Sequence, residues 1–300
     1  MNKKKGGSAM HSFLKAIGFQ DMTKKEVDQL LNDIIANPDR MEITTDSSNT
    51  DFAIIQKSFG ESFGIYVCGE YLENESFQAE YYFPYFIGKG ITTQENVDVE
   101  KHAEKESYAG ICDEIKLGVT LIFYLQNVAE YLAEKKIRNK MYGVTTTLSA
   151  LSLGGKILLP INKDEKQIRN IEKNSQNRTH LIAAAREGDE DAIENLTLED
   201  IDLYSMLSKR IVREDILSIV DTYFMPYGIE SDQYSVLGEI IDFHSVINSV
   251  TGLEVYNMTI DCNDLVFDVC VQAEDILGEP VIGRRFKGNI WMQGHLNYQD

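Results

Sequence analysis

The residue pattern best suited to chemistry in this 300-residue chain is a serine bracketed by glycines. The segment Gly60-Glu61-Ser62-Phe63-Gly64 matches the G-x-S-x-G pattern, in which α/β-hydrolases hold a nucleophilic serine on a strained turn between a strand and a helix. An apolar, strand-like segment precedes Ser62, but residues 64–68 continue as strand and not as helix. A hairpin turn therefore explains the motif better. A serine hydrolase that uses Ser62 is the alternative, and it would also need a later acid and a later histidine.

A second candidate is an alternating run of acids and a histidine. Its members are Glu100, His102, Glu104 and Glu106. In a strand, residues two apart project from one face, and carboxylate and imidazole groups are ligands for divalent metals. The other face carries Lys101 and Lys105 and is equally polar, which is typical of an exposed strand. Because the spacing fixes neither ligand number nor geometry, we predict no metal and no other cofactor.

The third candidate is a basic stretch that contains the single tryptophan. Its members are Arg284, Arg285, Lys287 and Trp291. Guanidinium groups bind carboxylate or phosphate through paired hydrogen bonds, and an indole ring can stack on a ligand. Pairing with the protein's own carboxylates is the simpler explanation, because the chain has 48 acidic residues. A small-anion or nucleotide site at this stretch is the second alternative.

Other chemistry-bearing patterns are incomplete. Gly154-Gly155-Lys156 is followed by Ile157, where a Walker loop requires Ser or Thr, and Gly88-Lys89-Gly90 lacks the third glycine of a dinucleotide-binding loop. The four cysteines form no C-x-x-C pair, which excludes zinc ribbons and thioredoxin-type redox sites. With no complete catalytic set, we expect a non-enzymatic binding or regulatory protein.

The net charge of the chain argues against some classes of binding partner. The chain has 29 Lys and Arg against 48 Asp and Glu, a net charge of −19 that opposes binding to nucleic acid and to anionic membranes. We therefore predict an unknown protein or small-molecule partner. Residues 186–215, with ten acids and four bases, could attract a basic partner, although such runs are more often the solvated side of helices. No apolar run has the length of a signal peptide or a membrane helix, so the cytoplasm is the expected compartment.

The elements that position these residues fall into two similar series. Thr23 and Glu26 form a capping box before a predicted helix over residues 24–36, and aromatic and β-branched runs over residues 52–86 predict strands. A helix over 128–136, capped by Asn127, and further strands follow. Helices over 181–195 and 198–212, the second capped by Thr197, then precede strands that reach the C-terminus.

This pattern predicts an α+β fold of two helix-then-antiparallel-sheet modules. Residues 1–9 are an extension, 10–161 the first module, 162–180 a linker or exposed helix, and 181–300 the second module. Similar segments recur at offsets of about 165 to 170 residues, such as residues 54–65 and 219–229. An internal duplication and a chance likeness of two strand-rich halves are both open.

Two segments carry a family resemblance. Met10-His11-Ser12-Phe13-Leu14-Lys15-Ala16-Ile17-Gly18-Phe19 and the stretch from Leu277 to Trp291 resemble an uncharacterised family of clostridial proteins, a domain of unknown function. The resemblance spans Met10 to about Tyr298, and it makes Met10 an alternative start. It implies a bacterial cytosolic protein and assigns no catalytic residue.

Overall fold

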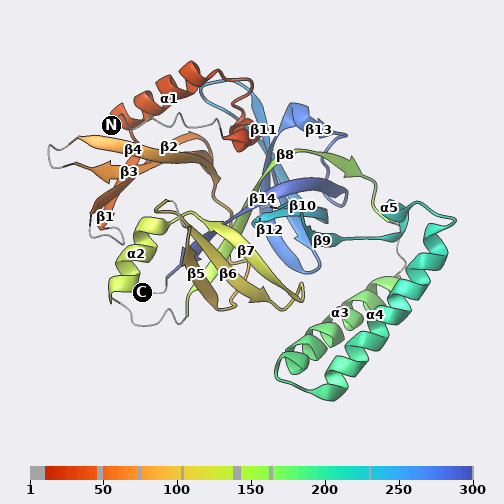
Figure 1. Ribbon diagram of the computed structural model, residues 1–300. Helices are drawn as coiled ribbons and strands as arrows, with labels where there is room; N and C mark the ends of the chain where they lie inside the picture. The colour runs from red at the N-terminus through yellow and green to blue at the C-terminus, as the bar shows by residue number, and fades with distance from the viewer. Residues whose placement is uncertain are drawn as a thin grey trace.

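A computed structural model describes residues 11–45, 50–72, 76–102, 105–137, 143–161, 165–229 and 231–298. Figure 1 shows a small sheet beside a larger one, with two long helices that project from the body. The predicted α+β class is confirmed. In the described residues, no helix has the length and apolar character needed to cross a membrane.

The small sheet is antiparallel, with the strand order β1-β2-β3-β4. Its strands are β1 (Arg40–Thr45), β2 (Asp51–Gly60), β3 (Phe63–Tyr71) and β4 (Phe77–Phe86). Helix α1 (Lys24–Ala36) covers one face of this sheet (Figure 1). The predicted capping box is confirmed, because the Thr23 hydroxyl accepts from the Glu26 amide at 3.4 Å and the Glu26 carboxylate accepts from the Thr23 amide at 2.7 Å.

Within the described ranges, the large sheet has ten strands of mixed direction. They are β5 (Val97–Lys101), β6 (Tyr108–Glu114), β7 (Val119–Leu125), β8 (Thr145–Leu158), β9 (Tyr223–Pro226), β10 (Gln233–Ile247), β11 (Glu254–Cys262), β12 (Leu265–Gln272), β13 (Ile276–Leu277) and β14 (Arg285–Asn297). Strand β8 pairs with β12 in parallel and with β14 in antiparallel fashion. The order β8-β12-β11-β10-β14 therefore returns to β8 and closes a five-stranded barrel.

The barrel is filled with apolar side chains and leaves little room at its glycines. Val236, Ile260, Val269 and Phe286 are fully buried. A side chain on Gly155 would place its Cβ 2.5 Å from the Phe286 ring, so the Gly154-Gly155 pair makes room for packing in the β8–β14 ladder.

A buried amide network joins the two sheets. Gln293 on β14 donates from Nε2 to the Pro84 carbonyl at 2.9 Å, and its Oε1 accepts from the Phe86 amide at 3.1 Å. The same Oε1 accepts from Nε2 of Gln126 at 2.8 Å. The end of β4 is thereby attached to the barrel, because a buried amide without these partners would be costly.

The helices complete the fold. They are the 3₁₀ helices η1 (Ser12–Ile17) and η2 (Ala273–Asp275), and the α-helices α2 (Val128–Ile137), α3 (Glu165–Arg186), α4 (Glu190–Ile211) and α5 (Ile216–Ile219). We call the hairpin of α3 and α4, residues 165–211, the arm. It projects from the body between β8 and β9 (Figure 1).

The predicted break near Thr197 is wrong. Gly188 ends α3 with a φ of 91°, and the Asp189 side chain accepts from the Ala192 amide at 3.0 Å and caps α4. The Thr197 hydroxyl instead donates to the Ile193 carbonyl at 2.8 Å, so this residue lies inside the helix.

An internal duplication is not shown. Residues 54–55 lie within β2, whereas their predicted counterpart Ile219 ends the helix α5. Strands from both sides of residue 162 share the large sheet, since β8 pairs with β12 and β14.

Candidate functional site

Ser62 lies in a two-residue turn between β2 and β3. Its φ is 70°, in the left-handed region, and its carbonyl accepts from the Ile87 amide at 2.7 Å. A Cβ on Gly64 would lie 2.0 Å from the Lys57 carbonyl oxygen, so this glycine allows close strand pairing. Because strand β3 follows the serine directly, Ser62 is not on the strand-to-helix turn that a hydrolase nucleophile requires.

Arg285 is turned into the protein, with 5% of its surface exposed. Its Nε and Nη2 donate to the Leu159 carbonyl at 3.0 and 2.9 Å, and Nη2 also donates to the Leu217 carbonyl at 2.9 Å. Nη1 donates to the carbonyls of Val220 at 2.9 Å and Asp221 at 3.4 Å. All three nitrogens are thus engaged by backbone, and the segments that precede and follow the arm meet at one guanidinium group. We call this arrangement the arm clamp.

The other members of the basic stretch do not join Arg285. Arg284 donates to the Glu279 carbonyl at 2.8 Å and lies 3.9 Å from the Glu279 carboxylate. Lys287 stands opposite Lys156 in the β8–β14 ladder. Trp291 is six residues beyond Arg285, about 20 Å along an extended strand, and its Nε1 donates to Asp232 at 2.8 Å.

Trp291 belongs instead to a buried cluster of rings. The ring centroids of His11, Phe13 and Tyr124 lie 4.9, 5.3 and 5.2 Å from that of Trp291. Burial, assisted by the charge of Lys105, lowers the pKa of His11 to about 4, so this ring is neutral at pH 7. His102 stacks on Tyr124 at 5.9 Å. Phe13 and Trp291 are buried and form part of the packed core, whereas His102 is exposed at its edge.

The acid and histidine run does not converge on a metal. Glu104 lies outside the described residues, and Glu106 is buried, where it accepts from Lys101 and from the Tyr108 hydroxyl at 2.5 Å. Among the residues that the structure describes, no three His, Cys, Asp or Glu side chains are placed to hold a metal ion.

His102 makes the one contact in this region that resembles a nucleophile and its base. Its Nδ1 lies 2.9 Å from the Ser107 hydroxyl, and its amide donates to the Ser107 carbonyl at 2.9 Å. Ser107 is buried and sits just before β6, so the pair closes the β5–β6 hairpin. The four cysteines are buried as well, and burial raises the pKa of Cys112 and Cys262 to about 12, which keeps them as thiols.

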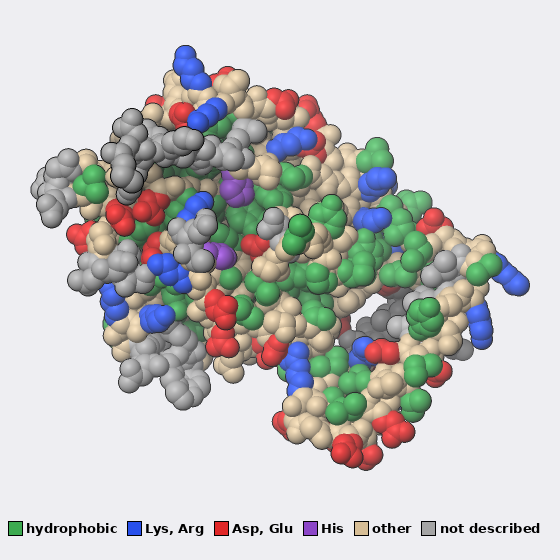
Figure 2. Space-filling view, in the orientation of Figure 1, with side chains coloured by type: hydrophobic (Ala, Val, Ile, Leu, Met, Phe, Trp, Pro, Cys, Tyr) green, Lys and Arg blue, Asp and Glu red, His purple; other side chains and the backbone are tan. Residues whose placement is uncertain are grey.

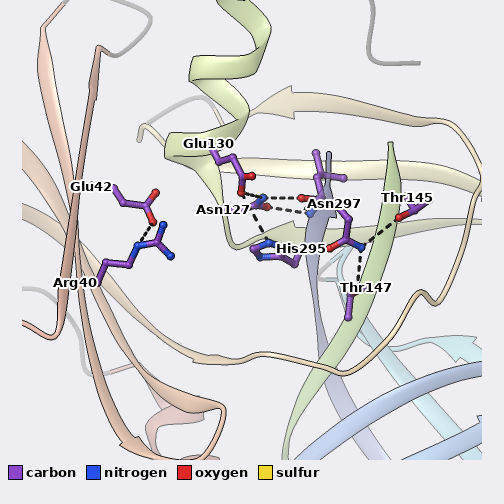
Figure 3. A network of polar contacts seen from close by, with 9 residues as sticks. Arg40, Glu42, Asn127, Glu130, Thr145, Thr147, His295 and Asn297 are labelled. Carbon is purple, nitrogen blue, oxygen red and sulfur yellow. Dashed lines mark hydrogen bonds and ion pairs between the residues drawn. The ribbon is translucent and has the colours of Figure 1, made fainter. Parts of the chain in front are cut away.

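Partly exposed charged groups meet at a different place, where the small sheet adjoins the large one. Figure 3 shows Arg40 and Glu42 of β1 on one side and Glu130 of α2 and His295 of β14 on the other. We call these four side chains the junction site. Arg40 and Glu42 are two residues apart on one strand and therefore share a face, and Glu130 lies in the first turn of α2.

Asn127 fixes the helical side of the junction site. Its Oδ1 accepts from the Leu296 amide at 3.0 Å, and its Nδ2 donates to the Leu296 carbonyl at 2.9 Å and to Oε2 of Glu130 at 2.8 Å (Figure 3). The helix predicted after Asn127 is confirmed, but the amide oxygen binds β14 and not the helix amides. Asn297 extends the network to the Thr147 hydroxyl at 3.0 Å.

The two charged neighbours of His295, Glu130 and Arg40, shift the pKa of its imidazole in opposite directions. Oε2 of Glu130 lies 3.9 Å from Nε2 of His295 and raises the pKa of the imidazole, whereas burial, the largest effect, and the charge of Arg40 lower it. The net pKa is below the ordinary value. The Arg40 side chain is 69% exposed, and its Nε lies 3.0 Å from Oε1 of Glu42.

The junction site was missed because no local pattern marks it. No motif or local run in the sequence contains Arg40, Glu42, Glu130 or His295. These residues are 255 positions apart at the extremes, and only the return of β14 to the middle of the sheet brings them together. The alternation of charges at residues 40 and 42 was the one available signal.

The described residues thus define an α+β protein in which a small antiparallel sheet adjoins a closed barrel and a helical arm projects from it. The chain belongs to the family described as "Domain of unknown function, E. rectale Gene description (DUF3881)", which matches residues 14–294. This confirms the expected family of unknown function over nearly the whole chain. No curated protein and no solved structure matches the chain.

Proposed function

We propose that this protein is a non-enzymatic binding protein that takes a small anionic ligand at the junction site. The observation that carries the proposal is that the exposed Arg40 and the partly exposed His295, from strands distant in sequence, face the same space (Figure 3), near enough for the charge of Arg40 to act on the imidazole. The candidate residues Arg284, Arg285 and Trp291 already donate hydrogen bonds to groups of the protein. They therefore have fewer donors available for an anionic ligand.

The two carboxylates of the junction site orient the basic groups. Glu42 holds Nε of Arg40, which leaves the two terminal nitrogens of the guanidinium to face a ligand. Glu130 is fixed by Asn127 and would stabilise an imidazolium at His295. A carboxylate or phosphate between Arg40 and His295 would therefore be bound by one permanent charge and would draw a proton onto the histidine.

Histidine NMR tests this directly. With inorganic phosphate or succinate as the probe, we expect the ring resonances of His295 to shift saturably and its pKa to rise, because the anion stabilises the charged ring. Arg40→Ala should abolish both effects. Arg284→Ala is the matched control, since it removes a surface arginine elsewhere, and it should retain them. If neither anion moves the His295 resonances at millimolar concentration, the proposed ligand class is wrong.

The non-enzymatic part of the proposal has its own test. A fluorophosphonate probe should leave the protein unlabelled, because Ser62 lies on a hairpin turn and Ser107 is buried. Labelling that disappears in Ser62→Ala or in Ser107→Ala would establish the hydrolase alternative instead. Turnover in a broad hydrolase and phosphatase screen, lost on changing one polar residue, would do the same.

A further inference from the structure

We infer that the outer face of α4 is a self-docking face, through which the arm packs antiparallel against α4 of a second copy of this chain. The inference is independent of the ligand proposed for the junction site. It starts from how the arm is covered. One side of α4 packs on α3, where Ala192 is buried and Arg178 contacts Asp200 at 2.9 Å and Glu199 at 3.6 Å.

The opposite side of α4 carries large apolar side chains in water. Ile193, Leu198, Ile201 and Tyr204 are 48%, 54%, 54% and 74% exposed. They span twelve residues, about three helical turns, and their angular positions fall within one side of the helix. Figure 2 shows hydrophobic side chains along the projecting arm with acidic side chains among them. A contiguous exposed apolar stripe on an element that stands away from the body is typical of an interaction surface.

The distribution of charged residues along α4 indicates which partner fits the self-docking face. The N-terminal end of this outer face carries Asp191 and Glu194, and the C-terminal end carries Lys209. In a parallel pair of such helices like charges would meet. In an antiparallel pair the acidic end of each copy lies beside the basic end of the other, so the face is complementary to itself.

One register satisfies both the charges and the apolar residues. A two-fold axis at Ile201 sets that side chain against its own copy and sets Leu198 against Tyr204 of the second copy. The same register puts Glu194 within one helical turn of Lys209 of the second copy. Arg210 is not needed, because its guanidinium already contacts Glu214 at 2.7 Å. Four apolar side chains from each copy make a small interface, below the ~800 Å² per partner of standard complexes. We therefore expect a weak dimer, with a Kd on the order of 10 to 100 μM, that weakens with salt.

Sedimentation velocity on the full chain between about 5 and 500 μM tests the face. The expected result is a reversible monomer–dimer equilibrium that shifts at least tenfold toward monomer in Ile201→Glu, because this substitution sets two carboxylates together at the two-fold axis. Ile282→Glu is the matched control: it changes a 62% exposed isoleucine outside the arm and should dimerise like the wild type. Circular dichroism verifies that each variant is folded.

A charge swap tests the antiparallel register. Lys209→Glu alone should weaken the dimer, and Glu194→Lys together with Lys209→Glu should restore it, since every copy carries both positions. A chain that stays monomeric at 500 μM, or a dimer that survives Ile201→Glu, would overturn the inference. A dimer that Ile201→Glu abolishes but the charge swap does not restore would overturn the register.

Discussion

The closed barrel and the arm differ in which side chains are exposed to solvent and which are buried. On barrel strand β14, two polar side chains are buried and hydrogen-bonded: Gln293 has contacts to β4 and to Gln126, and Arg285 binds four carbonyl groups. In the arm, Ile201 and Tyr204 are more than half exposed. Removing a polar group should therefore lower the free energy of unfolding most in the buried barrel. Removing an apolar group should lower it least on the solvent-exposed arm.

The arm clamp joins the two regions, and its loss should have the largest effect. Arg285→Ala removes a buried cation and leaves the carbonyls of Leu159, Leu217 and Val220 without their donor. We expect the free energy of unfolding to fall by about 3–5 kcal/mol, measured by urea unfolding. Arg284→Ala, whose arginine is on the surface, should change it by less than ~1 kcal/mol. An Arg285→Ala variant as stable as Arg284→Ala would mean that the clamp is not a joint.

Acid should weaken the barrel through His11. The pKa of His11 is lowered to about 4 in the folded protein, whereas an unfolded histidine has a pKa of about 6.5. As the pH falls, the unfolded chain therefore binds a proton at His11 before the folded protein does. The contribution of neutral His11 to the free energy of unfolding is complete above pH 6.5 and is lost as the pH drops toward 4. The loss should be on the order of 2–3 kcal/mol, and His295 adds a contribution of the same sign.

Unfolding measured at several pH values checks this. His11→Phe should flatten the dependence between pH 6.5 and 4. His180→Phe, which changes an exposed histidine on the arm, is the control for the substitution itself. An unchanged slope in His11→Phe would place the titrating group elsewhere.

The amide network should follow. Gln293→Leu keeps the volume of the side chain but leaves the Pro84 carbonyl and the Phe86 amide unbonded in the interior. A loss of about 2 kcal/mol is expected, measured by thermal unfolding. A neutral effect would indicate that water replaces the glutamine.

The smallest effect is expected on the arm. Ile201→Ala should change the unfolding free energy of the monomer by less than ~0.5 kcal/mol, because this side chain buries little surface. Its matched control in the barrel is Ile260→Ala, where a fully buried isoleucine is truncated and about 2–5 kcal/mol should be lost. Equal losses at dilute concentration would remove the distinction between arm and barrel.

Local elements could be predicted from the sequence where neighbours in the chain decide them. Helix α1 and its Thr23 cap were predicted because the apolar spacing and the capping box lie within fifteen residues. The stop between α3 and α4 was missed because the left-handed Gly188 is a stronger break than Thr197, whose hydroxyl can bond inside a helix. Strands β2 to β4 lie where the aromatic and β-branched runs predict them, and a hairpin explains Gly60 to Gly64.

The barrel and the site could not be predicted in this way. Closure of the barrel depends on the pairing of β8 with β14, which are more than a hundred residues apart. No sequence pattern within either strand predicts which strand it pairs with. Arg285 shows the consequence, because a guanidinium suited to bind an anion is equally suited to bind backbone carbonyls. Which of the two it binds is decided by the chain that folds over it, here the ends of the arm.

The central position of β14 has a consequence for how the protein is made. This strand follows all other strands in chain order, yet it lies between β10, β8 and β7. On the ribosome, the earlier strands must wait with open edges until β14 emerges, and open edges invite pairing with other nascent chains. Biosynthesis at low temperature or with abundant chaperones should therefore raise the yield of folded protein more than a change in the arm would.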